Sequence, residues 1–290
     1  MSDRLPIGIT NTSYGVYGAF GRYDKIAEDG YEYVDFQEFA NIKSDFFNLG
    51  EEEFHAALTR EREYMTALGL AVSQAHAPWI WGPGRDQTPE DRAHWLECMK
   101  KAIRGTHTLG CPRFVLHALL PYEDTDKNAE EVVELNAEFI AAVADYAKDY
   151  GITVCLENLP FPKHPVSSVA QVCAVVDKAG RENLKVCLDT GHAAIYDTDV
   201  ASAVRYIGER LCALHIHDNM GDTDAHLIPG DGVIDWDSVA AALSEIGFSG
   251  VVSLETSPKH GQHPKELWGE REKMLADIAR GIATKSKTHK

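Results

Sequence analysis

The sequence predicts a single (β/α)₈ barrel of the α/β class. Along its 290 residues, short apolar runs rich in β-branched side chains alternate with longer segments whose apolar residues recur with the period of a helix. No linker or break in composition interrupts this alternation, so we expect one domain over residues 1–290. The alternative is an open doubly wound sheet, which would normally carry a glycine-rich phosphate loop after its first strand. Residues 8–21 contain no G-x-G-x-x-G pattern, which disfavours that alternative.

Eight apolar runs are the expected strands. In chain order they are residues 6–10, 31–37, 70–76, 113–118, 152–158, 184–190, 211–217 and 250–256. Helical periodicity between them predicts helices over residues 51–68, 89–109, 128–150, 166–179, 198–208, 236–247 and 264–283. The polar residues from about 284 onward are expected to form a frayed end.

Capping residues support the helix boundaries. Thr88 and Asp235 each precede an acidic first turn, as N-caps do. Four expected helices are followed by a glycine just before the next strand, where a residue with positive φ commonly ends a helix. These glycines are Gly69, Gly151, Gly180 and Gly247.

Composition limits the classes of partner. The net charge of −17 and the pI near 5.1 disfavour attraction to a phosphate backbone, so we expect no nucleic-acid partner. The six cysteines are scattered without a C-x-x-C pair, which indicates a reducing compartment. No signal-peptide pattern and no apolar run of membrane-spanning length occur, so a cytoplasmic protein without membrane association is expected.

Titratable residues stand at or near the last position of six consecutive expected strands. In a parallel barrel the carboxyl ends of the strands meet in one funnel, where chemistry collects. Burying these charged side chains without a cation would cost roughly several kcal/mol for each charge. The pattern therefore indicates a bound metal ion. The six residues are His76, His117, Glu157, Asp189, His215 and Glu255.

Four of these residues form the expected metal site. Glu157, Asp189, His215 and Glu255 offer three carboxylates and one imidazole, a hard set suited to one divalent ion, Mn²⁺ or Mg²⁺, with Zn²⁺ as a further candidate. Side chains alternate between the two faces of a strand, so His215 and His217 lie on the same face. This alternation therefore does not decide which of the two histidines is the metal ligand. The polar stretch 214–232 around them has a second interpretation, a solvated acidic loop that happens to hold histidines.

Several motifs resemble the xylose isomerase-like TIM barrel superfamily, which includes sugar phosphate isomerases and epimerases, ketose 3-epimerases and endonuclease IV. They are L-E-N-L-P at 156–160, C-L-D-T-G-H-A at 187–193, L-H-I-H-D-N at 214–219, D-A-H-L-I-P-G-D-G-V-I-D-W at 224–236 and S-L-E-T at 253–256. The resemblance implies a barrel with the same four metal ligands. It also selects His215, because the family's histidine ligand stands three residues before the aspartate of an H-x-x-D pattern, here Asp218.

The resemblance further implies six substrate-contacting side chains around the metal. They are His76, His117, His192, His217, Asp224 and His226. In endonuclease IV the counterparts of all of these except His217 bind further zinc ions, so the chain matches all nine ligand positions of a trinuclear site. Against a nuclease, the opening segment differs from the endonuclease pattern, and residues 117–131 are acidic where phosphates would need cations.

We therefore expect a metal-dependent sugar isomerase or epimerase that acts on a small sugar or polyol. Glu157 and Glu255 are the expected acid and base, which exchange a proton with an enediolate stabilised by the metal. The alternatives are an endonuclease IV-like phosphodiesterase, a sugar lyase or dehydratase, and a binding scaffold without activity. Resemblance alone implies a homodimer. Aromatic residues after the strands are expected to line the funnel: Trp79, Trp81, Phe161 and Tyr196.

Overall fold

Eight parallel strands form one sheet in the computed structural model, which describes residues 3–79, 88–119, 129–196 and 199–287. Neighbours pair in the order β7-β6-β5-β4-β3-β2-β1-β8. The strands are β1 Ile7–Thr10, β2 Tyr33–Phe36, β3 Ala71–His76, β4 Arg113–Leu116, β5 Thr153–Glu157, β6 Leu184–Asp189, β7 Leu211–His215 and β8 Val252–Leu254. The predicted (β/α)₈ barrel is confirmed.

The barrel closes between β7 and β8 just beyond the end of β7. Ile216 forms an isolated parallel bridge with Leu254. Its amide donates to the carbonyl of Ser253 at 2.9 Å, and its carbonyl accepts from the amide of Glu255 at 2.9 Å. The seam therefore has fewer hydrogen bonds than the regular ladders between the other neighbouring strands.

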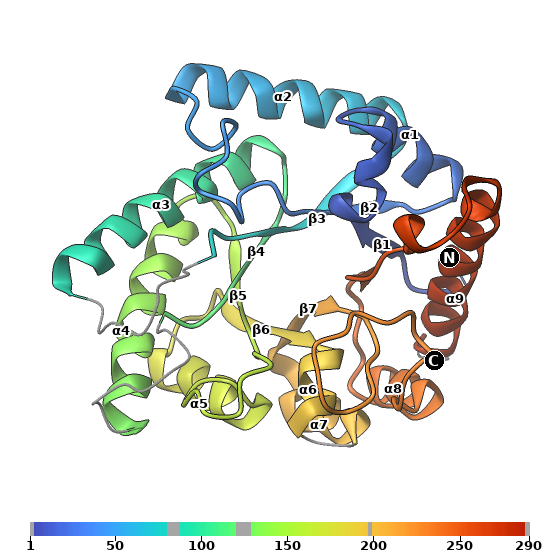
Figure 1. Cartoon of the computed structure of the whole chain (residues 1–290). Coiled ribbons are helices and arrows are strands. Elements are labelled where there is room, and N and C mark those ends of the chain that lie inside the picture. The colour runs from blue at the N-terminus through green and yellow to red at the C-terminus, as the bar shows by residue number, and fades with distance from the viewer. Residues whose placement is uncertain (1–2, 80–87, 120–128, 197–198, 288–290) are drawn as a thin grey trace.

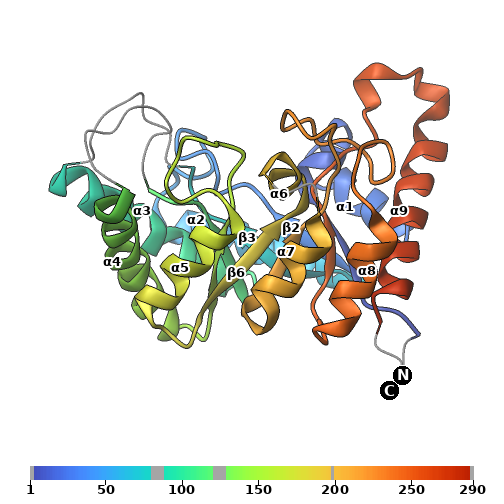
Figure 2. The same cartoon turned by 90° about the horizontal axis from the view of Figure 1, so that it is seen from below.

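Helices surround the strands (Figures 1 and 2). The described α-helices are α1 Gly21–Glu28, α2 Glu51–Ala67, α3 Pro89–Thr108, α4 Ala129–Lys148, α5 Val169–Ala179, α6 Thr190–Tyr196, α7 Val200–Ile207, α8 Trp236–Glu245 and α9 Trp268–Lys285. Short 3₁₀ segments are η1 Asn11–Tyr17, η2 Gly208–Arg210, η3 His260–Gln262 and η4 Lys265–Leu267. Helices α1 and α6 are additions to the prediction. Helix α1 has eight residues and α6 has seven, which are too few to show a clear helical period in the sequence.

The predicted boundaries agree with the local geometry. Thr88 and Asp235 both cap their helices, since the side chain of Thr88 accepts from the Asp91 amide and that of Asp235 from the Asp237 and Ser238 amides. All four predicted end glycines have positive φ, between 61° and 80°. The frayed end predicted from about 284 is wrong for the described residues: α9 continues to Lys285, and Ser286 is buried and donates to the carbonyl of Ile282. Residues 288–290 lie outside the described part of the chain.

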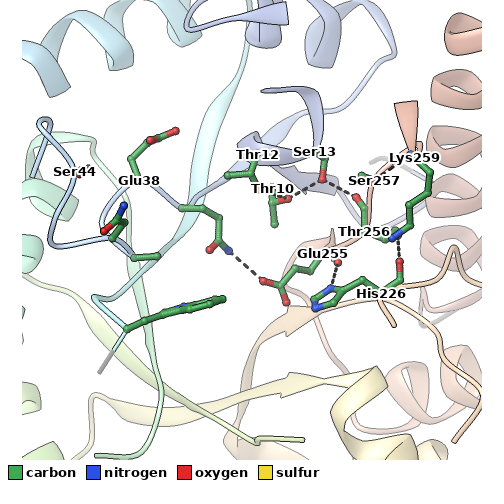
Figure 3. Close-up of a pocket in the computed structure, with 14 residues that line it drawn as sticks. Thr10, Thr12, Ser13, Glu38, Ser44, His226, Glu255, Thr256, Ser257 and Lys259 are labelled. Atoms are coloured by element: carbon green, nitrogen blue, oxygen red, sulfur yellow. Dashed lines mark hydrogen bonds between the residues drawn. The ribbon is translucent and has the colours of Figure 1, made fainter. Parts of the chain in front are cut away.

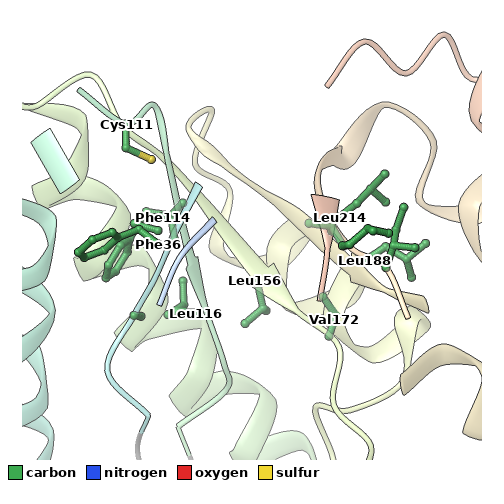
Figure 4. Close-up of a cluster of buried hydrophobic side chains, with 14 of the residues drawn as sticks. Phe36, Cys111, Phe114, Leu116, Leu156, Val172, Leu188 and Leu214 are labelled. Atoms are coloured by element: carbon green, nitrogen blue, oxygen red, sulfur yellow. The ribbon is translucent and has the colours of Figure 1, made fainter. Parts of the chain in front are cut away.

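Alternate side chains of each strand pack on opposite sides of the barrel wall. One set faces the helices and builds the main apolar core, for example Phe114, Leu156 and Leu188 (Figure 4). A smaller buried set includes Val115 and Cys155, which precede His117 and Glu157 by two positions in the sequence. The period of two therefore points the residues at the strand ends into the barrel mouth. No helix in the described ranges is long and apolar enough to span a membrane.

Candidate active site

The six titratable residues predicted at strand ends lie where the sequence placed them. His76, Glu157, Asp189 and His215 are the last residues of β3, β5, β6 and β7. His117 and Glu255 follow β4 and β8 directly. Because all strands are parallel, the six side chains gather at one end of the barrel.

The four predicted metal ligands form one compact cluster. Ligand atoms of Glu157, Asp189, His215 and Glu255 all lie within 4.8 Å of one another. His215 Nδ1 lies 2.8 Å from Glu157 Oε1 and 3.2 Å from Glu255 Oε2. Glu157, Asp189 and His215 are almost fully buried, whereas the side chain of Glu255 keeps 15% of its surface exposed.

Asp35 on β2 completes this cluster from the opposite wall of the barrel. Its Oδ2 atom lies 2.9 Å from His215 Nε2, and both side chains are fully buried. Gln74 on β3 donates to the same oxygen at 3.0 Å. A carboxylate behind a histidine is the usual way to orient the ring of a metal ligand. With Nδ1 facing the carboxylates and Nε2 facing Asp35, the donor set fits a divalent ion.

The pKa values of the cluster are shifted because several carboxylates lie close together and are buried. Burial raises the pKa of Glu157, but the imidazoles of His215 and His117 outweigh it and hold that pKa well below its usual range. Burial raises the pKa of Glu255 to about 7, against the effect of His215 and with the help of Glu157. Burial opposes the charged form of His215, yet Glu157 and Glu255 raise its pKa well above the ordinary value. The site thus concentrates negative charge that a cation can neutralise.

His217 lies beside the four-ligand cluster rather than in it. Its Nε2 donates to Asp189 Oδ2 at 3.0 Å, and its ring stacks on His226 with centroids 4.0 Å apart. It belongs to a second group of potential ligands together with His192, Asp224 and His226. His215 is therefore the histidine that the structure brings to the three carboxylates.

This second group is oriented by backbone carbonyls. His192 Nδ1 donates to the carbonyl of Asn158 at 2.8 Å, and His226 Nδ1 donates to the carbonyl of Glu255 at 2.6 Å. The Nε2 atoms of both rings then face Asp224, each at 3.3 Å. Burial lowers the pKa of both imidazoles, but neighbouring aspartates, Asp189 for His192 and Asp224 for His226, raise the two values to about 10 and about 9.

His76 and His117 form a third group with Glu157. Glu157 Oε2 lies 3.5 Å from His76 Nε2 and 3.1 Å from His117 Nε2, while its other oxygen faces His215. Glu157 therefore joins two groups of potential ligands. Burial lowers the pKa of His117. All six residues predicted to contact substrate thus lie around the four-ligand cluster, in two groups.

The loop between β7 and α8 is not merely a solvated acidic loop. Asp218 is fully buried and accepts hydrogen bonds from the amides of Asn219 and Gly230 and from the indole of Trp236, all at 2.9 Å. This carboxylate folds the loop so that Asp224 and His226 return to the site. Asp222 remains exposed, as the alternative interpretation expected for the whole loop.

Among the described residues, two of the cavities open beside the cluster. The smaller, of 260 Å³, is lined by His76, His117, Glu157, His192, Asp224 and the two predicted aromatic residues Trp79 and Phe161, among others. The larger, of 510 Å³, is lined mainly by polar residues of the β1, β2 and β8 loops (Figure 3). Glu255 and His226 line both. Tyr196 ends α6 and lines neither of these two, and Trp81 lies outside the described residues.

Sequence reasoning missed Asp35, Asn158 and Gln37. Asp35 carried a signal, a carboxylate between the apolar residues Val34 and Phe36 of an expected strand. Asn158 was visible within the motif L-E-N-L-P: its side chain holds the backbone of Asp189 by hydrogen bonds of 2.8 and 2.9 Å. Gln37 Nε2 lies 3.4 Å from Glu255 Oε1, and no pattern in the sequence pointed to it.

Comparison with known proteins gives matches over most of the chain. The model of the xylose isomerase-like TIM barrel family matches residues 23–278. The D-psicose 3-epimerase of Agrobacterium fabrum is 32% identical over 158 residues, which are 53% of this chain and 52% of that protein. The chain spans about half the length of several curated relatives it matches.

Solved structures share the fold. A D-psicose 3-epimerase in the presence of D-fructose superposes with a TM-score of 0.79 at 20% identity, over 97% of this chain and 100% of the other. The IOLI protein with a binding zinc atom gives a TM-score of 0.79 at 21% identity, over 96% and 99%. The match of the family model over residues 23–278 confirms the resemblance found in the sequence motifs, and this chain belongs to the xylose isomerase-like TIM barrel family.

Proposed function

We propose that this protein is a divalent-metal-dependent sugar isomerase or epimerase in which Glu157 and Glu255 transfer a proton to and from a ketose. The observation that carries the proposal is the convergence of Glu157, Asp189, His215 and Glu255 within 4.8 Å at the mouth of the barrel. The similarity to the D-psicose 3-epimerase of Agrobacterium fabrum supports a sugar substrate. We propose one ion per chain, Mn²⁺ or Mg²⁺, with Zn²⁺ also suited to this donor set.

The residues of the chain have separate parts in this chemistry. When bound, the ion would supply positive charge to stabilise an enediolate. Glu157 ends β5 and Glu255 directly follows β8, and both line the smaller cavity, so they reach a substrate there from different sides. One removes the proton next to the carbonyl and the other returns it. Asp189 and His215 hold the ion, and Asp35 lies 2.9 Å from Nε2 of His215, on the side of the ring away from the other carboxylates.

The groups around the cavity can orient hydroxyls. His192 and His226 present Nε2 atoms on one side, next to Asp224, and His117 lies on the other. Trp79 and Phe161 add aromatic faces, which suit the apolar face of a sugar ring or chain. The smaller cavity of 260 Å³ and the larger of 510 Å³ meet at Glu255 and His226 and together offer room for a monosaccharide.

Metal removal and a ketose panel test the proposal. Protein stripped with EDTA should be inactive, and Mn²⁺ or Mg²⁺ should restore epimerisation of one or more ketoses with incorporation of solvent deuterium at the reacting carbon, followed by NMR. A ligand present at a hundred times its dissociation constant stabilises by about 2.7 kcal/mol, which for 290 residues raises the melting temperature by about 4 °C.

Asp189→Asn and Asp222→Asn form a matched pair for this experiment. Asp189 is buried in the cluster, whereas Asp222 is exposed in the loop that follows β7. The first variant should lose the response to metal and the second should keep it. Absence of any thermal or catalytic response to Mn²⁺, Mg²⁺ or Zn²⁺ in the unmodified protein would contradict the proposal.

A second candidate is a zinc phosphodiesterase that acts on abasic DNA. The two further groups of potential ligands, His76–His117–Glu157 and His192–His217–Asp224–His226, favour it, because they give room for more than one ion. The charge of −17 opposes it, since binding DNA requires several phosphate contacts. Three zinc ions per chain together with EDTA-sensitive cleavage at an abasic site would make this candidate the better one.

A further inference from the structure

One lysine stands in the wall of the larger cavity. Lys259 lies in the loop after β8, four positions after Glu255, and both line the 510 Å³ space (Figure 3). In Figure 3 its side chain extends toward the part of the pocket where Glu255 and His226 lie. Among the residues that the structure describes, its ammonium group has no hydrogen bond and no ion pair; its backbone amide donates to Ser257 Oγ at 3.2 Å.

The other charges of this cavity are already matched. Glu38, on the opposite side of the pocket in Figure 3, lies 2.6 Å from the guanidinium of Arg22 and accepts from Asn11 at 3.2 Å. Glu255 faces His215. Lys259 is therefore a partly buried cation without a counterion at hydrogen-bond distance. Burial lowers the pKa of Lys259, and the negative charge of Asp224 opposes that shift without cancelling it, so keeping this ammonium away from water has a net cost.

The fold holds Lys259 in this place at a conformational cost. Its φ of 57° and ψ of 45° lie in the left-handed region, which residues with a side chain rarely adopt. The next residue, His260, is buried, and its Nε2 donates to Glu272 Oε1 at 2.6 Å. Tyr17 donates to the same oxygen at 2.6 Å. The turn is thus anchored to α9 and to η1, and Lys259 is fixed at the edge of the cavity.

Neighbouring hydroxyl groups complete a polar end of the cavity. Ser44 lies on the opposite side of the cavity, beside Glu38, whereas Thr12, Ser13 and Ser257 line it on the side of Lys259. We propose that Lys259 and these hydroxyls bind an anionic oxygen group, a carboxylate or a phosphate, carried by the substrate at the end away from the reacting carbons. A single ammonium balances the one negative charge of a carboxylate, so a sugar acid fits best. This inference rests on the proposed function for the identity of the site, and its binding test does not depend on turnover.

The first test compares three ketoses that differ only at carbon 6. D-fructose ends in a hydroxyl, D-fructuronate in a carboxylate and D-fructose 6-phosphate in a phosphate. The ratio of kcat/KM for an anionic ketose to that for fructose should exceed one in the unmodified protein and fall by about 10- to 100-fold in Lys259→Met. Lys273→Met is the control, because Lys273 is exposed on α9 and its removal changes the net charge equally. The control should keep the ratio, and Lys259→Arg should keep more of it than Lys259→Met.

The second test measures binding without reaction. D-gluconate and D-glucitol have no ketone or aldehyde group, so neither is turned over. In calorimetric titrations the unmodified protein should bind gluconate more tightly, and Lys259→Met should lose that difference while melting normally. If no ketose reacts but this difference holds and disappears in Lys259→Met, the proposed function fails and the anion site stands. The opposite outcome is that ketoses react, but Lys259→Met has the same kcat/KM ratio of anionic to neutral ketose as Lys273→Met and the same preference for gluconate over glucitol. In that case the anion site is refuted and the proposed function stands.

Discussion

Gly191 gives a sharp test of the packing around the site. It lies in α6, and a Cβ atom added to it would be 2.0 Å from His217 Cε1 and 2.3 Å from Nδ1. The His217 ring would have to move by more than an ångström to reach ordinary contact. It has little freedom to do so, because it is fully buried, stacks on His226 at 4.0 Å and donates to Asp189 at 3.0 Å.

The expected magnitude follows from these contacts. Overpacking a buried position costs about 1–3 kcal/mol, and losing a hydrogen bond to a charged group about 1.5–3 kcal/mol. We therefore expect Gly191→Ala to destabilise the fold by about 2.5–6 kcal/mol. With an unfolding entropy of about 2.1 cal/mol/K per residue over 290 residues, the melting temperature should fall by about 4–10 °C. Displacing the partner of Asp189 should also weaken Mn²⁺ binding by about 10- to 100-fold.

Calorimetric melting and Mn²⁺ titration measure both effects. Gly281→Ala is the matched control: Gly281 lies inside α9, and an added Cβ would meet nothing within 4 Å. Alanine favours a helix interior over glycine by about 1 kcal/mol, so this control should melt slightly higher than the unmodified protein. If Gly191→Ala melts within a degree of the unmodified protein and binds Mn²⁺ equally well, the described packing of His217 against α6 is wrong.

Three further predictions concern single side chains. Glu157→Gln and Glu255→Gln should each reduce turnover at least about 100-fold, and their effects in the double variant should not add, because both serve one proton transfer; normal turnover in either would refute the proton-transfer scheme. His215→Asn should weaken Mn²⁺ binding more than His217→Asn in calorimetric titration, because only His215 faces the three carboxylates; the reverse order would move the site. Hydrogen bonding from Cys155 and the nearby Arg113 lower the pKa of Cys212 to about 6 despite burial, so iodoacetamide should label Cys212 with a midpoint near pH 6, while labelling of Cys98, whose pKa burial raises, should require higher pH. Peptide mass spectrometry across pH reads both thiols, and faster labelling of Cys98 at pH 7 would contradict this assignment.

The sequence was informative where local pattern and parallel topology determine position. Glu157, Asp189 and His215 could be placed because each ends an apolar run, and parallel strands end at the same side of a barrel. Asp35 was missed because its role depends on a contact across the barrel to a residue 180 positions later. Lys259 was missed because its position depends on a left-handed turn and on the packing of His260, neither of which has a periodic signature.

The closure of the barrel has a consequence for its motions. The seam between β7 and β8 rests on the single bridge of Ile216 with Leu254, so local opening costs least there. His215 and Glu255 stand on its two sides and are both members of the four-ligand cluster. An ion held by both would cross-link the two sides of this seam, where the barrel wall has few hydrogen bonds. Amide hydrogen exchange at Ile216 and Glu255 would then report whether the site is occupied. Exchange of these two amides should be slow with the ion bound and faster after a chelator removes it.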